Sequence, residues 1–291
     1  MDTLYNEITI IIILYEENVQ LVLRCLEKIK NFKIIIVDNA NDVFLKKEVE
    51  KNYKIFKYIL NKKNCGYAKA ANQAIKLSDT DFILMFQADG IIDKKNISKL
   101  LETFTKYENS FIVSPTLLDK NENLSTNSGS FPEKNFNKTP IKIEGDICAE
   151  TVLGSIVMFK RQDILEIGLY DENFFLYFLD DELCRRIRSQ KKSVIQVLNA
   201  KAVHAHGQIK VRNLFKKTFL RHFNFTFDEL YYFYKIKKHK RLFKKLKEKI
   251  PNYVIKLILN LIVLRLNRVA YFLSKMMAFY KFKNFIKKDN I

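Results

Sequence analysis

The chain has 291 residues, 48% of them hydrophobic, and a formal net charge of +19. This length suits one large domain or one domain with an appendage. The charge is local, because residues 208–291 hold 22 Lys and Arg against 4 Asp and Glu, a net of +18, which leaves +1 for residues 1–207. We therefore expect a nearly neutral domain over residues 1–207 and a basic extension over residues 208–291.

Several protein classes are excluded by motifs that the sequence lacks. The four cysteines form no CxxC pair, which argues against a zinc site and fits reduced thiols in the cytoplasm. GxGxxG and GxxxxGK[ST] are absent, so neither a dinucleotide fingerprint nor a P-loop is supported. Asp2 and Glu7 precede the first apolar run, the reverse of the basic start of a signal peptide, so we expect no export.

The first half of the sequence alternates strand-like and helix-like patterns. Continuous apolar runs rich in β-branched residues predict strands at residues 8–14, 34–37, 56–60, 82–86 and 156–159. Apolar residues at helical spacing predict helices at residues 19–29 and 67–77, and residues 125–140 read as a polar loop. This order is typical of an open, mostly parallel sheet with helices on both faces.

Polar residues follow the first four predicted strands directly. They are Tyr15 and Glu16, Asp38 and Asn39, Asn61 and Asn64, and Asp89. In open α/β sheets, ligands bind beyond the carboxyl ends of the strands, so the set predicts a nucleotide pocket at one rim. For each residue alone, a turn-former or a helix N-cap is the simpler interpretation.

Three consecutive acids, Asp180, Asp181 and Glu182, follow the aromatic and apolar run at residues 174–179. A carboxylate held against low-dielectric surroundings can have a raised pKa and serve as a general base. The alternative is that the acids form the exposed first turn of a helix, where the helix dipole favours negative charge. Both interpretations can hold together.

Five segments in this order carry a resemblance to a known family. They are Tyr15-Glu16, Val37-Asp38-Asn39, residues 64–72, Gln87-Ala88-Asp89 and residues 178–182. Together they resemble the family 2 glycosyltransferases of the GT-A fold, in particular the bacterial rhamnosyltransferase-like branch that builds surface polysaccharides such as lipopolysaccharide and capsule. The resemblance covers residues 8–207, and residues 64–72 match the pattern N-x-G-[FY]-A-x-A-x-N throughout.

The resemblance implies a fold and an activity. The fold is the α/β GT-A nucleotide-diphospho-sugar transferase fold, with a mostly parallel Rossmann-like sheet over residues 1–207 and a C-terminal helical extension over residues 208–291. The activity is that of an inverting, hexosyltransferase-type enzyme. It moves a sugar from a UDP- or dTDP-sugar, dTDP-rhamnose among them, to a hydroxyl of a growing surface glycan or lipid-linked acceptor.

The resemblance also implies roles for single residues. The donor-binding residues it implies are Tyr15, Glu16, Asp38, Asn64, Gly66, Asn72, Gln87 and Asp89. Asp38 would accept the imide N–H of uracil or thymine, and Gly66 would let the helix start approach the diphosphate. Asp180 matches the catalytic aspartate, Glu182 an acidic residue that binds the acceptor, and His204 a histidine near the metal or diphosphate.

Two positions depart from the family pattern. Gln87 replaces the first Asp of D-x-D, so Mg²⁺ or Mn²⁺ would be held weakly, by Asp89 and His204 together with the donor. Leu179 replaces the Glu before the catalytic Asp, and Asp181 is an extra acid, so the base is Asp180 or Asp181, with Asp180 favoured by register. These departures leave open an alternative, a catalytically inactive GT-A binding or scaffold protein at the membrane.

A second histidine, His206, follows His204 at a spacing of two. The simplest interpretation is a strand on which one of the pair is merely exposed. We therefore expect one functional histidine.

The basic extension combines lysines with an apolar run. Residues 235–249 are Lys-rich, and the apolar residues of 254–279 that follow are interrupted by Lys256, Asn260, Arg265 and Arg268. The run is therefore too broken to span a membrane and favours an interfacial helix, peripheral on the anionic inner face of the cytoplasmic membrane. The alternative is a helical pair that packs on the main domain. A nucleic-acid partner is not expected, because Lys beside an apolar face differs from Arg interleaved with aromatics.

Overall fold

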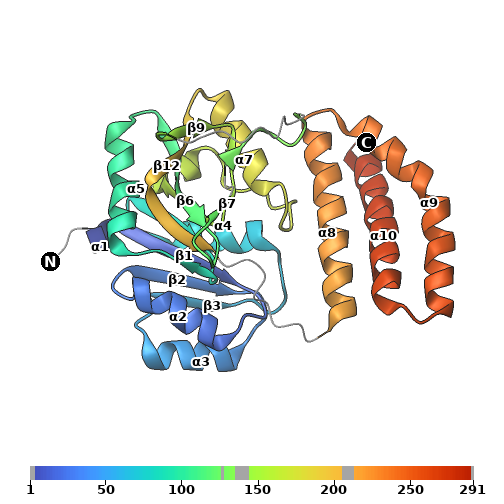
Figure 1. Ribbon diagram of the computed structural model, residues 1–291, viewed down its shortest axis with the longest axis horizontal. Coiled ribbons are helices and arrows are strands. Elements are labelled where there is room, and N and C mark those ends of the chain that lie inside the picture. Colours follow the sequence, from blue (N-terminus) through green and yellow to red (C-terminus); the bar gives the residue numbers. More distant parts are fainter. Residues whose placement is uncertain (1–3, 126–127, 135–143, 205–212, 290–291) are drawn as a thin grey trace. The chain divides into compact units, whose positions relative to one another are not determined.

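The structure of the chain is a computed structural model that describes residues 4–125, 128–134, 144–204 and 213–289 (Figure 1). The described residues group into two compact units. The first comprises Met1–Asp171 and Asp180–Lys210, and the second comprises Glu172–Leu179 and Val211–Ile291. The predictions for His206 and for part of the polar loop, residues 126–127 and 135–140, fall outside the described residues.

The first unit is built on a ten-stranded sheet in which the main path runs β3-β2-β1-β4-β11-β6-β12-β5, with β7 beside β6 and β9 beside β12. The strands of this sheet are β1 (Ile8–Leu14), β2 (Lys33–Asp38), β3 (Lys57–Leu60), β4 (Phe82–Phe86), β5 (Gly90–Ile91), β6 (Ser110–Leu118), β7 (Leu124–Ser125), β9 (Ile147–Ala149), β11 (Ile156–Lys160) and β12 (Ser193–His204). A separate two-stranded sheet joins β8 (Ser128–Gly129) and β10 (Thr151–Val152).

Helices connect and cover these strands. They are α1 (Leu4–Glu7), α2 (Val19–Ile29), α3 (Val43–Asn52), α4 (Tyr67–Leu77), α5 (Lys94–Lys106), α6 (Arg161–Glu166) and α7 (Leu179–Ser189). Figure 1 shows α2 and α3 together on one side of β1 to β3. The predicted strands at residues 8–14 and 82–86 and the predicted helix at residues 67–77 are confirmed to the residue.

The two halves of the sheet differ in direction. Strands β1 to β4 pair in parallel, as predicted. Strands β1, β2 and β4 are almost entirely buried because they lie between helices, whereas β3, at the edge of the sheet, is half-buried. Strand β11 instead runs antiparallel to both β4 and β6, and β12 is parallel to β6. Because Ile156 at the start of β11 pairs with Phe86 at the end of β4, β11 begins at the rim where β4 ends.

The second unit contains α8 (Leu214–Lys235), α9 (His239–Ile262) and α10 (Leu266–Asp289), which lie side by side in Figure 1. The basic extension therefore forms three helices, one more than the helical pair that was the alternative interpretation of the sequence. Rings of α8 and α10 pack edge to face, Phe227 and Tyr231 against Phe285 among them. Within the described part of the chain, no helix is both long and apolar enough to cross a membrane.

Residues 172–179 belong to the second unit and are held there by α8. The Asp228 carboxylate is fully buried and accepts the backbone N–H groups of Phe175, Leu176 and Tyr177 at 2.9–3.2 Å. Phe178 has a positive φ of 60°, which is unusual for a bulky residue, and its ring packs on Phe225 and Tyr232. The peptide just before Asp180 is therefore fixed by contacts from the helices.

Candidate active site

The ends of the parallel strands meet at one rim of the first unit. The Asn39 N–H donates to the Leu14 carbonyl and the Asn61 N–H to the Asp38 carbonyl, both at 2.9 Å. Tyr15 and Glu16 follow β1 directly, and Glu16 has a positive φ of 54°. The ends of these strands lie side by side, so the polar residues that follow them in the sequence begin at the same rim.

Asp38, the last residue of β2, is fully buried at this rim. Its Oδ1 accepts the Ala40 N–H at 2.7 Å and its Oδ2 accepts the Asp42 N–H at 3.1 Å, so the carboxylate closes its own turn. Burial raises its pKa, and the two backbone hydrogen bonds oppose that rise. Each oxygen has a second lone pair that can accept a further N–H group. The binding of a nucleobase by Asp38 stays a prediction.

A hydrogen-bond network that the sequence did not reveal joins two loops at the rim, the one after β2 and the one between β3 and α4. Asn39 donates from Nδ2 to the Gly66 carbonyl at 3.2 Å, and its Oδ1 accepts from Asn61 at 2.9 Å and from the Cys65 thiol at 3.2 Å. Asn64 Oδ1 accepts the Gly66 N–H at 3.0 Å. Gly66 itself has φ +89°, which favours glycine. The network fixes the start of α4.

Asn72, predicted to bind the donor, lies buried inside α4. Its Nδ2 donates to the Tyr170 carbonyl at 2.8 Å and its Oδ1 accepts the Tyr170 N–H at 3.1 Å. These reciprocal bonds tie α4 to the chain that leads toward residue 172. The structure thus gives Asn72 a positioning contact, and its contact with the donor stays a prediction.

Gln87, Asp89 and His204 lie close together at the rim. His204 Nε2 lies 2.9 Å from Gln87 Oε1 and 3.2 Å from Asp89 Oδ1. Glu17, which sequence reasoning missed, is near this cluster: burial and the Asp89 charge raise its pKa to about 7. Among the described residues no group of three or more His, Cys, Asp and Glu side chains is arranged to hold a metal.

Asp180 lies in the first turn of α7, half-buried, with its Oδ2 accepting the Gly154 N–H at 3.0 Å. Gly154 permits this approach, because a Cβ atom there would lie under 3.0 Å from the carboxyl carbon and both oxygens of Asp180. Burial raises the pKa of Asp180 to about 7, against the opposing bond from Gly154. The triplet therefore begins a helix, as the alternative interpretation expected, but its acids are half-buried or buried and not exposed. The role of Asp180 as a general base stays a prediction.

The other two acids of the triplet have different partners. Asp181 accepts the Thr151 hydroxyl at 2.8 Å, and burial raises its pKa to about 6. Glu182 is buried and forms an ion pair with Arg186 at 3.0 Å. This arginine also donates to backbone carbonyls at the end of α6, so Glu182 has a structural partner. Its contact with the acceptor stays a prediction.

Short contacts link the His204 cluster to Asp180. Gln87, whose side-chain Oε1 accepts from His204 Nε2, donates its backbone N–H to the Ser155 carbonyl at 3.0 Å. Ser155 follows Gly154, which donates to Asp180. The candidate metal ligands and the candidate base are therefore parts of one rim.

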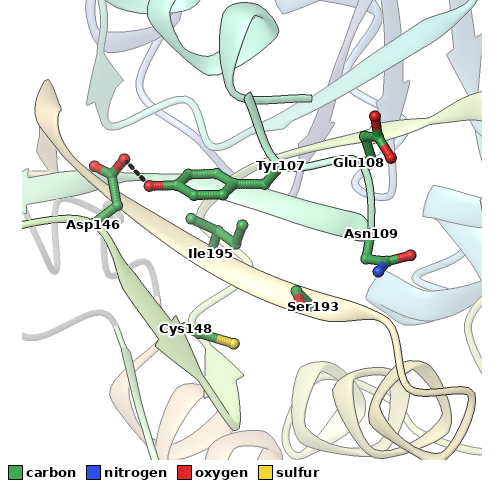
Figure 2. A pocket seen from close by; sticks show the side chains of 7 residues that line it. All are labelled: Tyr107, Glu108, Asn109, Asp146, Cys148, Ser193 and Ile195. Atoms are coloured by element: carbon green, nitrogen blue, oxygen red, sulfur yellow. Dashed lines mark hydrogen bonds between the residues drawn. The ribbon is translucent and has the colours of Figure 1, made fainter. Parts of the chain in front are cut away.

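A surface pocket of about 420 Å³ lies elsewhere in the first unit (Figure 2). It is lined by residues before β6 and at the start of β12, and so faces the amino ends of those strands. Its Asp146 already accepts from Tyr107, Lys106 and the Leu198 N–H. Because it holds none of the predicted site residues, we assign it no part in the site.

Sequence comparisons identify the family of the chain. The family model described as Glycosyl transferase family 2 matches residues 9–167, more than half of the chain. The chain is 25% identical over 215 residues to the low-salt glycan biosynthesis hexosyltransferase Agl10 of Haloferax volcanii, covering 69% of this chain and 68% of that protein. It is 27% identical over 195 residues to the dTDP-rhamnosyl transferase RfbF of Shigella flexneri (64% of each), and 26% over 225 residues to the rhamnosyltransferase WbbL of Escherichia coli (69% and 83%).

Solved structures show the same fold. The chain matches GalNAc-T7 with UDP, GalNAc and Mn²⁺ at a TM-score of 0.58 and 12% identity, covering 77% of this chain and 50% of that one. It matches the mannosyltransferase PcManGT of Pyrobaculum calidifontis, in complex with GDP-Man and Mn²⁺, at 0.52 and 13%, covering 76% and 62%. The predicted GT-A fold and the rhamnosyltransferase-like resemblance are confirmed. The chain belongs to glycosyl transferase family 2, and is a glycosyltransferase of the GT-A fold.

Proposed function

We propose that this enzyme is an inverting transferase that moves a sugar from a UDP- or dTDP-sugar to a hydroxyl of a growing surface glycan or lipid-linked acceptor. The observation that carries the proposal is the half-buried Asp180 carboxylate, placed at the rim by Gly154 and raised in pKa to about 7. The printed name of RfbF, a dTDP-rhamnosyl transferase, supports dTDP-rhamnose as the first donor to test.

In the proposed step, the acceptor oxygen bonds to the anomeric carbon as the bond from that carbon to the diphosphate breaks on the opposite face. The configuration inverts, and the hydroxyl proton passes to Asp180. A carboxyl with a pKa near 7 is a stronger base than an ordinary aspartate, yet it is substantially ionised at neutral pH. Asp181 is the alternative base. Its carboxylate accepts the Thr151 hydroxyl, and a variant of Asp181 is therefore the one to compare with a variant of Asp180.

We expect the cluster of Gln87, Asp89 and His204 to bind a divalent cation together with the donor diphosphate. Asp89 and Gln87 offer oxygen atoms, the ligands that Mg²⁺ and related cations prefer, and His204 Nε2 lies within 3.2 Å of an oxygen of each. A cation bound there would neutralise charge on the leaving diphosphate. Since one carboxylate alone belongs to the cluster, we expect the protein to hold the cation weakly until the donor diphosphate adds its own oxygens.

The proposal places the nucleobase near Asp38 and the diphosphate near Gly66 and the start of α4. It also places the enzyme at the inner face of the cytoplasmic membrane, where a lipid-linked acceptor would lie. The net charge of +18 over residues 208–291 supports this location, because anionic lipid headgroups attract such a segment.

The experiment is a screen of UDP- and dTDP-sugars by thermal shift with Mn²⁺ or EDTA, followed by NMR of the product of the donor that binds. We expect one donor to raise the melting temperature in Mn²⁺ and to give a product of opposite anomeric configuration. Retention of configuration would contradict the single displacement. Equal shifts in Mn²⁺ and EDTA would contradict the role of the cation.

A further inference from the structure

The second half of α9 and the turn that follows it expose large apolar side chains to solvent. Ile262 is 72% exposed and Leu264 78%. The other exposed apolar residues of this stretch are Val254, Ile255, Ile258, Leu259, Leu261, Val263 and Leu266. A folded domain rarely leaves so many neighbouring apolar side chains in water unless they contact a partner.

These residues share one face of the helix. Ile255, Ile258, Leu259 and Ile262 recur at spacings of three and four, and so lie on one side of α9. The opposite side is the packed one, since Leu246 and Tyr253 are buried and Tyr253 lies against Phe272 of α10. The exposed apolar face is therefore left over after the three helices have packed together.

The same face is basic in the first half of α9. Arg241 and Lys244 precede Ile255 by 14 and 11 residues, close to four and three helical turns, and both are exposed. We call this surface, from Arg241 to Ile262 together with the turn at residues 263–266, the α9 face. Its two halves present cations and apolar groups to the same side, which is the pattern of helices that lie in a membrane interface.

The apolar surface continues around the turn to the start of α8. A hollow of about 640 Å³ there is lined by Leu214, Phe215, residues 264–267 and Arg268. Among the described residues, neither Arg265 nor Arg268 has an acidic partner within ion-pair distance. Two unpaired guanidinium groups beside exposed leucines suit the phosphates at the boundary between headgroups and acyl chains.

We propose that the α9 face is the surface by which this enzyme docks on an anionic lipid bilayer, with the apolar half inserted and the basic residues on the phosphates. The inference deepens the membrane location of the proposed function. A second copy of the chain fits the face less well, because each copy would bring the same basic residues to the contact and like charges repel. A bilayer of anionic lipid complements both halves of the face.

The test is flotation of the full-length protein with vesicles of phosphatidylcholine alone or with phosphatidylglycerol, without donor or acceptor. Ile258→Asn/Ile262→Asn should lower partitioning on anionic vesicles by about tenfold or more, in low and high salt alike. Arg241→Ala/Lys244→Ala should lower partitioning by about tenfold or more in low salt. The same variant should change it little in high salt, because salt already screens the attraction between these residues and the lipid headgroups. Matched controls on the first unit are Phe44→Asn and Lys28→Ala/Lys47→Ala, which change exposed residues and should bind as wild type does.

Three outcomes would overturn the proposal. The first is wild-type protein that ignores phosphatidylglycerol vesicles at low salt, and the second is an apolar variant that binds them fully. The third is a wild-type dimer in solution that Ile258→Asn/Ile262→Asn dissociates with no change in vesicle binding, which would assign the face to self-association. Transfer to a short soluble acceptor, assayed on the same apolar variant, should be unchanged. Loss of vesicle binding with intact transfer separates this inference from the catalytic proposal.

Discussion

The position of the Asp180 carboxylate depends on a residue with no side chain. Gly154 donates its N–H to Oδ2 of Asp180 at 3.0 Å, and a Cβ atom at residue 154 would fall under 3.0 Å from all three carboxyl atoms. The backbone at Gly154 is not in the left-handed region, so alanine is disfavoured there by the approach of Asp180 and not by φ. The glycine is therefore a positioning residue for the proposed base.

Gly154→Ala should slow transfer by about 10²-fold or more, because displacement of a reacting group by about 1 Å has an effect of that size. The measurement is kcat with a soluble acceptor, together with circular dichroism to confirm the fold. Gly145→Ala is the matched control, since nothing lies within 4 Å of a Cβ atom at that position. Equal kcat in Gly154→Ala and wild type would show that Asp180 tolerates displacement, contrary to a role as base.

At the scale of elements, α8 shapes the peptide that leads into α7. Asp228 accepts three backbone N–H groups from residues 175–177, and aromatic rings of α8 hold Phe178 at its positive φ. Asp180 follows two residues later in the chain. Within the second unit, α8 therefore orders the segment that precedes Asp180 in the chain.

Asp228→Ala should lower both the melting temperature and the transfer rate. Removal of the carboxylate leaves three backbone donors without their acceptor, and each buried unpaired donor costs about 1–3 kcal/mol. Asp228→Asn keeps an acceptor oxygen, so its melting temperature and its transfer rate should lie between those of Asp228→Ala and wild type. Glu248→Ala, an exposed acid on α9, serves as the control. Wild-type stability in Asp228→Ala would mean that water replaces the carboxylate at no cost.

Elements with a local signal could be predicted from the sequence. The apolar run of β1 and the pattern of α4 gave their bounds correctly, and the ends of parallel strands located the rim. Contacts between residues distant in sequence could not be predicted. The spacing of apolar residues, two for a strand and 3.6 for a helix, carries no information about such contacts. The Asp180–Gly154 bond spans 26 residues, the Asn72–Tyr170 pair 98 and the His204–Gln87 contact 117. Residues 174–179 were interpreted only as an aromatic and apolar run, because the sequence does not show that α8 packs against them.

At the scale of the whole molecule, several buried carboxyls make stability depend on pH. Burial raises the pKa of Asp180 and Glu17 to about 7 and that of Asp181 and Asp228 to about 6. In the unfolded chain these groups ionise near pH 4. Between pH 4 and 7 the folded state therefore binds more protons than the unfolded state, and stability falls as pH rises.

The melting temperature of the ligand-free protein should therefore fall between pH 5 and pH 7.5, and Asp180→Asn should flatten part of that fall. The variant should melt above wild type at pH 7.5, because asparagine stays neutral while its amide oxygen can still accept from Gly154. Acids whose pKa is lowered, such as Asp79 and Asp146, change stability below this window and do not mask the effect. Superimposable pH profiles for the two proteins would contradict the raised pKa of Asp180.

The central claim, that Asp180 is the base of sugar transfer, is tested most directly by the rates of Asp180→Asn and Asp181→Asn measured side by side. We predict that Asp180→Asn lowers kcat by about 10²–10⁴-fold, the usual effect of removing a general base. Its thermal shift with the nucleotide should match that of wild type, since the base acts on the acceptor, and Asp181→Asn should keep most of its activity. Full turnover by Asp180→Asn, with Asp181→Asn inactive, would contradict the account and move the base one residue along α7.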